Sequence, residues 1–231
     1  GACRFSPDGR WLLTASADDC RLWNAQTWES EGECPGAPRS SWFGRNAIAF
    51  SRDGQFLVTG ASDLSQVPDH LRVWRLPELE ELPPIRFTGF GGGLPPMSVA
   101  FSADGQQLIV GHWSGEIVVW DFETRKVVAT LREHVGWITA IALAADGKSF
   151  ATTSTDGTVR VWDAATFKPL VRLRGHVSEV WAGAISPDGS MVVSCSAAKT
   201  TKLWSTSTRH NDTVLHGPGR LLGLLEGGRQ L

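Results

Sequence analysis

The sequence predicts an all-β protein built from repeated units, because two independent markers recur along its 231 residues with a similar period. The first marker is a tryptophan that closes a short aliphatic or β-branched run, at intervals of 51, 46, 42 and 42 residues. The second is an Asp-Gly pair, at intervals of 45, 51, 42 and 42 residues. The tryptophans are Trp23, Trp74, Trp120, Trp162 and Trp204, and the pairs begin at Asp8, Asp53, Asp104, Asp146 and Asp188.

The clearest copy, residues 134–174, predicts four short strands in each unit. Large and small side chains alternate over Ile138–Leu143, which is typical of a strand with two distinct faces. We expect the second strand at Phe150–Ser154, the third at Thr158–Trp162 and the fourth at Pro169–Leu173. Asp-Gly turns separate the first three strands, since glycine readily takes the positive φ of a tight turn.

A single four-stranded sheet cannot bury its own apolar faces, whereas sheets stacked radially cover one another and leave few free edges. The sequence therefore predicts a β-propeller of four-stranded antiparallel blades, with five blades and the start of a sixth, as a fragment of a longer propeller. The units are approximately residues 1–30, 46–90, 96–132, 134–174, 176–216 and a partial unit at 217–231. The insertion Leu64–His70 and the connections Glu29–Arg45 and Pro77–Pro96 are expected to be loops, where recognition is often placed.

Several motifs of these units resemble those of the WD-repeat (WD40) propellers. They are Phe-Ser-Pro-Asp-Gly from residue 5, Ser-Thr-Asp-Gly-Thr-Val-Arg-Val-Trp-Asp from residue 154 and Gly-His at residues 175–176. The resemblance covers nearly the whole chain and implies a propeller of about seven blades. It also implies a buried hydrogen-bonded tetrad, made of an opening His, a second-strand Ser or Thr, a turn Asp and the third-strand Trp.

The resemblance places a complete tetrad in the fourth unit only. Its members there are His134, Ser154, Asp156 and Trp162. In the fifth unit the members are His176, Ser196 and Trp204, but Ala198 replaces the aspartate. In the third unit His112 occupies the serine position and Ser114 the aspartate position. Such a network satisfies buried polar groups that would otherwise cost about 1–3 kcal/mol each.

The composition and the missing motifs argue against several classes of function. The net charge is -2 with scattered basic residues, which predicts no binding of nucleic acid or of an anionic membrane. No apolar run approaches the roughly 20 residues that span a bilayer. No His or Cys pair has metal-ligand spacing, and no nucleophile elbow, HExxH or P-loop pattern occurs. We therefore expect no catalytic residue, no metal and no cofactor.

The four cysteines, Cys3, Cys20, Cys34 and Cys195, have no paired spacing. We interpret them as reduced thiols of an intracellular, cytoplasmic protein. One disulfide in a secreted protein is the alternative.

Candidate contact residues follow from the resemblance, because partners of the family dock on the face that carries the tetrad turns. The residues expected there are Trp113, Trp137, Thr139, Thr155, Glu179 and Trp181, with Trp42 in a long loop as a weaker candidate. Tryptophan is enriched among the residues that dominate binding energy at interfaces. The alternative is that these indoles pack between blades.

These observations together predict a non-catalytic scaffold that binds protein partners by rigid display of its loops. Two other functions stay open. One is a propeller hydrolase or lactonase with a metal held by carboxylates in the central channel. The other is a sensor domain of a larger signalling kinase or protease.

Overall fold

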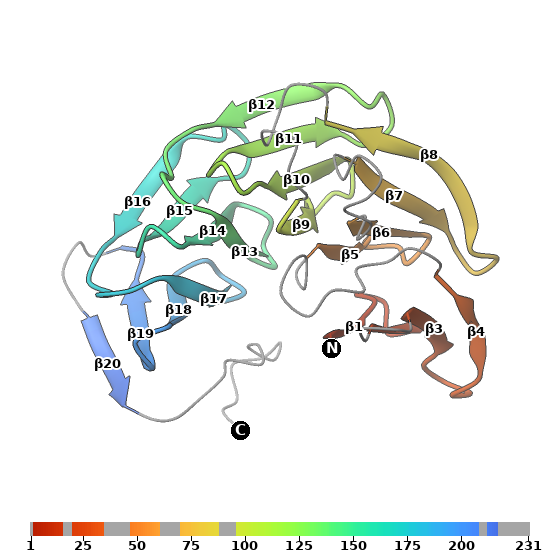
Figure 1. Ribbon diagram of the computed structural model, residues 1–231, viewed down its shortest axis with the longest axis horizontal. Coiled ribbons are helices and arrows are strands. Elements are labelled where there is room, and N and C mark those ends of the chain that lie inside the picture. The colour runs from red at the N-terminus through yellow and green to blue at the C-terminus, as the bar shows by residue number, and fades with distance from the viewer. Residues whose placement is uncertain are drawn as a thin grey trace.

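The computed structural model describes residues 2–15, 20–34, 47–60, 70–87, 96–207 and 212–216, without the side chains of Ala2 and 212–216. These residues form five four-stranded antiparallel sheets and no helix. The sheets stand side by side along an arc, with the first strand of each on the inner side and the fourth on the outer side (Figure 1). This is the all-β architecture of radial blades that the repeat period predicts.

Each blade consists of four consecutive strands. Blades 1 and 2 contain β1 (Ala2–Phe5), β2 (Trp11–Ala15), β3 (Cys20–Asn24), β4 (Ser30–Glu33), β5 (Ile48–Phe50), β6 (Phe56–Gly60), β7 (His70–Arg75) and β8 (Glu80–Arg86). Blade 3 contains β9 (Ser98–Phe101), β10 (Gln107–Gly111), β11 (Ile117–Asp121) and β12 (Val127–Leu131). Blades 4 and 5 contain β13 (Ile138–Leu143), β14 (Ser149–Ser154), β15 (Val159–Asp163), β16 (Pro169–Leu173), β17 (Val180–Ile185), β18 (Met191–Ser196), β19 (Thr200–Ser205) and β20 (Asp212–His216).

In blade 4 the predicted strands are confirmed to within one residue. The first and fourth strands have the predicted bounds, and the second begins one residue earlier, at Ser149. The third begins at Val159 because Thr158 belongs to the preceding turn. The backbone N–H and the hydroxyl of Thr158 both donate to Asp156 Oδ1, at 2.9 and 2.6 Å.

Two segments expected to be loops contain the outer strands of blades 1 and 2, so this part of the prediction was wrong. Strand β4 lies within the segment Glu29–Arg45, and β8 lies within Pro77–Pro96. These two strands were not predicted because they contain glutamates or prolines, which are depleted in strands. Among the strands that the structure describes, β8 pairs with β7 alone, so its outer edge makes no ladder hydrogen bonds with them and tolerates Pro83 and Pro84.

Two other expectations lie outside the described residues. One is the insertion Leu64–His70, of which only His70 is described, as the first residue of β7. The other is the partial sixth unit at 217–231.

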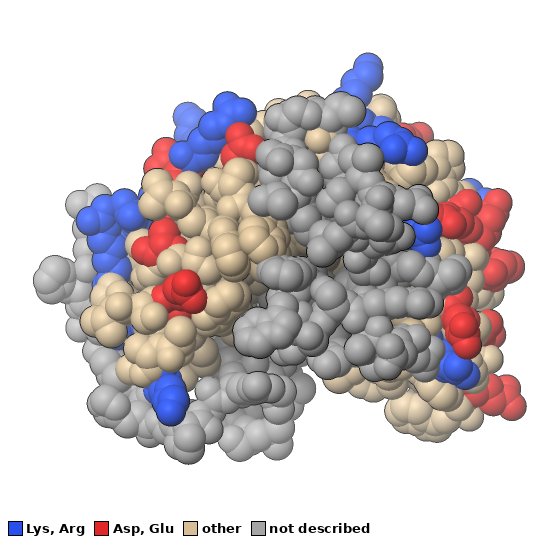
Figure 2. Space-filling view, viewed as in Figure 1, with Lys and Arg blue, Asp and Glu red and all other residues tan. Residues whose placement is uncertain are grey.

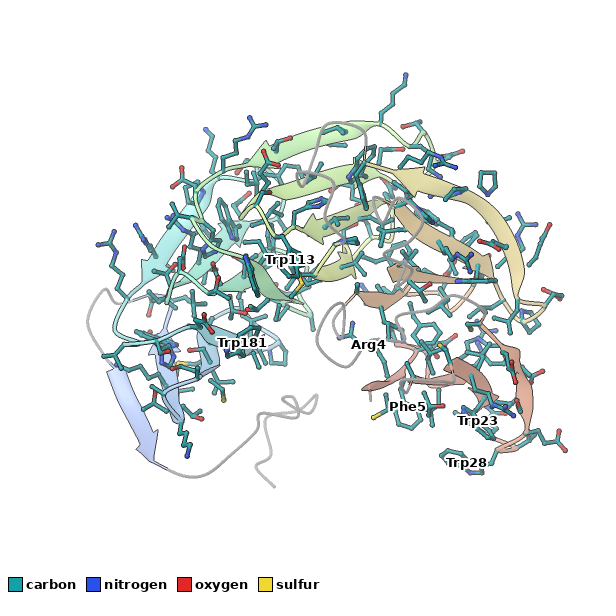
Figure 3. All side chains as sticks on the ribbon, viewed as in Figure 1. Arg4, Phe5, Trp23, Trp28, Trp113 and Trp181 are labelled. Atoms are coloured by element: carbon teal, nitrogen blue, oxygen red, sulfur yellow. The ribbon has the colours of Figure 1, made fainter. Side chains whose placement is uncertain are left out.

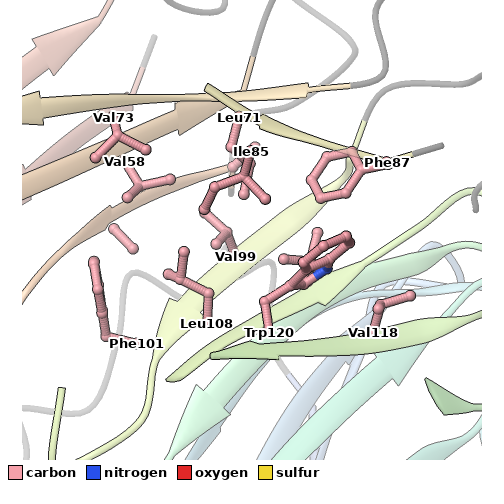
Figure 4. Close-up of a cluster of buried hydrophobic side chains, with 13 residues drawn as sticks. Val58, Leu71, Val73, Ile85, Phe87, Val99, Phe101, Leu108, Val118 and Trp120 are labelled. Carbon is pink, nitrogen blue, oxygen red and sulfur yellow. The ribbon is translucent and has the colours of Figure 1, made fainter. Parts of the chain in front are cut away.

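The hydrophobic core lies between blades, in four clusters at the four junctions. At each junction the tryptophan-bearing face of one blade packs on the aliphatic face of the preceding blade. Figure 4 shows the junction of blades 2 and 3, where Val58 and Val73 of blade 2 share a cluster with Leu108 and Trp120 of blade 3. The third-strand tryptophans of blades 2 to 5 are all buried. Burial between successive sheets is what holds the arc together.

Blade 1 presents its tryptophan-bearing face differently. Phe5 is 56% exposed, whereas the corresponding Phe50 of blade 2 is buried. Trp23 is half-buried, and neither Phe5 nor Trp23 belongs to any of the four clusters. Figure 3 shows Phe5, Trp23 and Trp28 together at this end of the arc. This face therefore contributes less buried apolar area than its counterparts in blades 2 to 5.

Two further findings bear on the sequence predictions. In the parts of the chain that the structure describes, no helix is long and apolar enough to cross a membrane. The four cysteines are free thiols, of which Cys20 and Cys34 are buried, Cys195 is half-buried and Cys3 is exposed.

Candidate functional site

A buried hydrogen-bonded network in blade 4 fixes the loops from which the candidate site is built. His134 Nδ1 lies 2.8 Å from Asp156 Oδ2, and His134 Nε2 lies 2.9 Å from Thr152 Oγ1. The indole Nε1–H of Trp162 donates to the same Thr152 oxygen, also at 2.9 Å. One hydroxyl therefore joins the tryptophan of the third strand to the histidine of the loop that enters the blade.

The central hydroxyl is Thr152 and not the predicted Ser154. Trp162 stands opposite Phe150 in the register of β14 and β15, so Thr152 is the next residue on the same face. Ser154 lies two residues further, at the end of the strand, where its Oγ accepts the backbone N–H of Asp156 at 3.1 Å. Ser154 therefore shapes the turn and does not contact the indole.

Blade 5 requires the same correction, because its central hydroxyl is Ser194 and not Ser196. His176 Nε2 and Trp204 Nε1 both lie 2.8 Å from Ser194 Oγ. Ser196 accepts the backbone N–H of Ala198 at 3.0 Å. His176 Nδ1 contacts Thr200 Oγ1 at 3.2 Å, which replaces part of the missing aspartate contact.

Protonation in the blade 4 network follows from burial and from the hydrogen-bond partners. Burial lowers the pKa of His134, so the imidazole is neutral. Burial alone would raise the pKa of Asp156, but hydrogen bonds from His134 and Thr158 outweigh it and hold the pKa far below its usual range. The carboxylate can only accept, so His134 Nδ1–H donates to it, and His134 Nε2 accepts the hydroxyl proton of Thr152. Every polar atom of the network then has a partner.

The network and the turn beside it position Trp137. The backbone N–H of Val135 donates to Asp156 Oδ2 at 3.2 Å. The backbone N–H of Trp137 donates to Thr155 Oγ1 at 2.9 Å, and the Thr155 N–H donates to the Trp137 carbonyl at 3.0 Å. Thr155, a predicted contact residue, is half-buried, and its hydrogen bonds hold Trp137 in place.

Three of the predicted contact residues meet in one aromatic group that spans three blades. Trp113 lies in the turn between β10 and β11, Trp137 directly precedes β13, and Trp181 is the second residue of β17. The ring centroids of Trp113 and Trp137 are 4.1 Å apart, and those of Trp137 and Trp181 are 6.4 Å apart in an edge-to-face arrangement. Figure 3 places Trp113 and Trp181 near the inner strands of the arc.

This aromatic group is partly open to solvent. Trp181 is 39% exposed, and Trp113 and Trp137 are half-buried. Two valines in the loops that enter blades 4 and 5 are far more exposed, Val135 at 87% and Val177 at 89%. Sequence reasoning missed these valines, although both directly follow the opening histidine of their unit. We call Trp113, Trp137, Trp181, Val135 and Val177 the tryptophan surface.

The remaining candidates differ in their surroundings. Glu179 is exposed, and its backbone carbonyl accepts the N–H of Ala197 at 2.9 Å. Thr139 is only 2% exposed, so its assignment as a contact residue was wrong. Its hydroxyl lies 2.7 Å from Thr153 Oγ1 and donates to the carbonyl of Val180 in blade 5 at 2.7 Å. Thr139 therefore holds two blades together, and Trp42 lies outside the described residues.

A hollow of about 450 Å³ lies where the first strands of blades 2 to 4 end. Most of the residues that line it are apolar, among them Phe50, Phe101 and Leu143, and Arg52 is the charged one. Arg52 Nη1 donates to the Ala103 carbonyl at 3.0 Å and so bridges two blades. In the described ranges, no group of three or more His, Cys, Asp or Glu side chains is placed to hold a metal ion.

Comparison with known protein families agrees with this geometry. The family model described as WD domain, G-beta repeat matches five segments, at residues 1–24, 40–65, 86–121, 125–163 and 167–205. Together they cover more than half of the chain, and four of them contain a third-strand tryptophan. Because each match contains the first two strands of one of the five consecutive blades, the chain belongs to the WD-repeat (WD40) family.

Proposed function

We propose that this chain is a non-catalytic scaffold that binds a protein partner through the tryptophan surface. The observation that carries the proposal is the contact of three indoles from three successive blades, with Trp181 open to solvent. The two exposed valines extend the apolar area into the loops that enter blades 4 and 5.

The chemistry of these side chains suits a protein partner. A partly exposed indole offers a large, rigid apolar area together with an N–H donor, which is why tryptophan is frequent at the centre of interfaces. Burial of an exposed valine side chain contributes about 1.5 kcal/mol or more. A partner that covers Trp181, Val135 and Val177 would therefore gain affinity mainly from apolar contact.

The charged residues around the surface fit the polar rim of an interface. Glu179 and Glu133 are exposed, and Glu133 Oε2 accepts a hydrogen bond from the buried Arg160 at 3.1 Å. Figure 2 shows charged side chains mainly toward the periphery of the arc on the viewed face. A partner with apolar anchor side chains in a polar surround is complementary to this arrangement.

Rigid display supports the same function. The loop that carries Val135 and Trp137 is fixed by Asp156 and Thr155, and the indole of Trp137 packs on that of Trp113. Ordering these residues on binding therefore costs little conformational entropy, so more of the contact energy appears as affinity.

Site-specific photo-crosslinking tests the proposal. A photoreactive amino acid replaces Trp181 in the full chain expressed in its host cells, and the matched control carries it in place of Trp28, an exposed tryptophan of blade 1. We expect a defined protein to crosslink at position 181 and not at position 28. Equal crosslinking at both positions, or none at position 181, would contradict the proposal.

A further inference from the structure

Two cysteines stand opposite one another at the junction of blades 1 and 2. Cys20 is the first residue of β3, and Cys34 directly follows β4. Arg21 pairs with Glu33 in this antiparallel ladder, so the next pair outward is Cys20 with Cys34. The backbone N–H of Cys34 donates to the Cys20 carbonyl at 2.8 Å, which continues the ladder to this pair.

The two thiols share one environment. Cys20 is 7% exposed and Cys34 is 2% exposed, and both belong to the core cluster between blades 1 and 2. A hydrogen bond with the Cys20 thiol and then burial raise the pKa of the Cys34 thiol. The side chains therefore point to the same side of the sheet and contact each other. The 14-residue separation gives no sequence motif, so only the strand register reveals the pair.

The register meets the geometric requirement of a disulfide. Directly opposite residues in a hydrogen-bonded antiparallel pair have Cα atoms about 5.5 Å apart. Disulfides join residues whose Cα atoms are about 4.4–6.8 Å apart. We propose that Cys20 and Cys34 are a modification site, which forms an intramolecular disulfide by exchange with a low-molecular-weight disulfide such as oxidised glutathione.

The exchange balances in two steps. The Cys20 thiolate attacks one sulfur of the small disulfide, forms a mixed disulfide and releases one small thiol, which takes the proton. The Cys34 thiolate then attacks the Cys20 sulfur and releases the second small thiol. Two protein thiols are oxidised and one small disulfide is reduced. We expect Cys20 to react first because it is the more exposed of the two thiols.

A disulfide between Cys20 and Cys34 would link β4, the outer strand of blade 1, covalently to β3. Strand β4 is largely exposed, and three residue pairs with an irregularity between Leu22 and Trp23 join it to β3. The chain already connects the two strands at the other end, between Asn24 and Ser30. A bond between Cys20 and Cys34 would close the open end, so oxidised protein should resist denaturation better than reduced protein.

The test uses a full-length variant with Cys3→Ser and Cys195→Ser, which leaves only the proposed pair. The folded protein is equilibrated with oxidised glutathione, its thiols are trapped by alkylation, and its peptides are mapped by mass spectrometry without reduction. We expect a linked peptide pair that has lost two hydrogens, its disappearance on reduction, and a higher melting temperature for the oxidised form. Protein oxidised after unfolding confirms that the assay detects the link.

Other outcomes would overturn the proposal. Glutathione that stays attached to Cys20 without transfer to Cys34 would show that the thiols are not placed to react with each other. Two unmodified thiols in the folded protein, with a link in the unfolded control, would show that the folded geometry prevents the bond. Cys34→Ala keeps a small apolar group in the core and should yield only the mixed disulfide at Cys20. The test does not involve the tryptophan surface, so its result is independent of the proposed partner binding.

Discussion

Blades 3 and 4 are neighbours with the same order of strands, but different contacts surround their buried tryptophans. In blade 4 the indole N–H of Trp162 bonds Thr152, which in turn bonds His134. In blade 3 Val110 stands at the position of Thr152, since Leu108 pairs with Trp120 as Phe150 pairs with Trp162. Phe87 packs against Trp120 there, with ring centroids 5.7 Å apart.

Burial of the tryptophan therefore does not require the polar network, because both indoles are buried. The network of blade 4 additionally connects the third strand to the loop that carries Val135 and Trp137. Blade 3 instead contains a buried histidine, His112, whose ring packs edge-on against Phe87 with centroids 4.9 Å apart. Neither ring nitrogen of His112 has a hydrogen-bond partner among the described residues.

The largest effect is expected when the tryptophan of the network is truncated. Trp162→Ala should lower the free energy of unfolding by about 3–5 kcal/mol, because it leaves a cavity and removes the partner of Thr152. Urea denaturation of the variant and of the wild type measures the difference. A loss below about 1 kcal/mol would mean that Trp162 is not buried in solution.

Acid should destabilise blade 3 through His112. Burial lowers its pKa to about 4, and the nearby carboxylate of Glu116 offsets this only in part. An unfolded histidine has a pKa of about 6.5, so the stabilisation is complete above that pH and is lost as the pH falls from 6.5 toward 4. The loss should approach about 3 kcal/mol. Unfolding free energies at several pH values, in wild type and His112→Gln, measure this contribution.

The His112→Gln variant should retain a weaker pH dependence, because the pKa of His134 is lowered in the same direction. If the variant and the wild type lose stability equally between these pH values, His112 does not take up a proton on unfolding.

Removal of the shared hydroxyl should have an intermediate effect. Thr152→Val keeps the side-chain volume nearly unchanged but leaves the Trp162 N–H and His134 Nε2 without their partner, at a cost of about 1–3 kcal/mol. The matched exchange in blade 3, Val110→Thr, only adds one hydroxyl near an indole and should cost less. Chemical denaturation of both variants measures the two losses of unfolding free energy. Equal losses would show that the network contributes nothing beyond packing.

The smallest effect is expected at the tryptophan of blade 1. Trp23→Ala removes a half-buried indole whose N–H donates to Thr14 Oγ1 at 2.9 Å. We expect a loss of about 1 kcal/mol, since the truncated group already contacts solvent. Its unfolding curve, recorded beside that of Trp162→Ala, gives the difference between the two faces. A loss as large as that of Trp162→Ala would mean that the face of blade 1 is covered in solution.

The sequence predicts the blades well because period and strand patterning are local properties. In blade 4 the strand bounds were confirmed to within one residue, since the Asp-Gly turns mark them. The hydroxyl of the network was placed two residues too far along, at Ser154, because residue patterns alone do not show which residue of the second strand shares a face with Trp162. The hydrogen bond instead depends on the strand register, which sets Phe150 opposite Trp162 and so makes Thr152 the next residue on that face.

Other features of the site depend on long-range geometry that residue patterns do not carry. Thr139 and Trp181 occupy the same position of their units, and the strand register is irregular at both. One side chain is buried between blades and the other is open to solvent. The contact between Cys20 and Cys34 likewise arises only when β3 and β4 pair.

The central claim is that the tryptophan surface binds a protein. Its most direct test is titration calorimetry with the protein that crosslinking identifies, purified separately. The partner is titrated into the wild type, Trp181→Ala and Trp28→Ala. We predict at least about a tenfold weaker affinity for Trp181→Ala, the loss expected of a residue at the centre of an interface, and an unchanged affinity for Trp28→Ala. Equal affinity of all three proteins would contradict the claim.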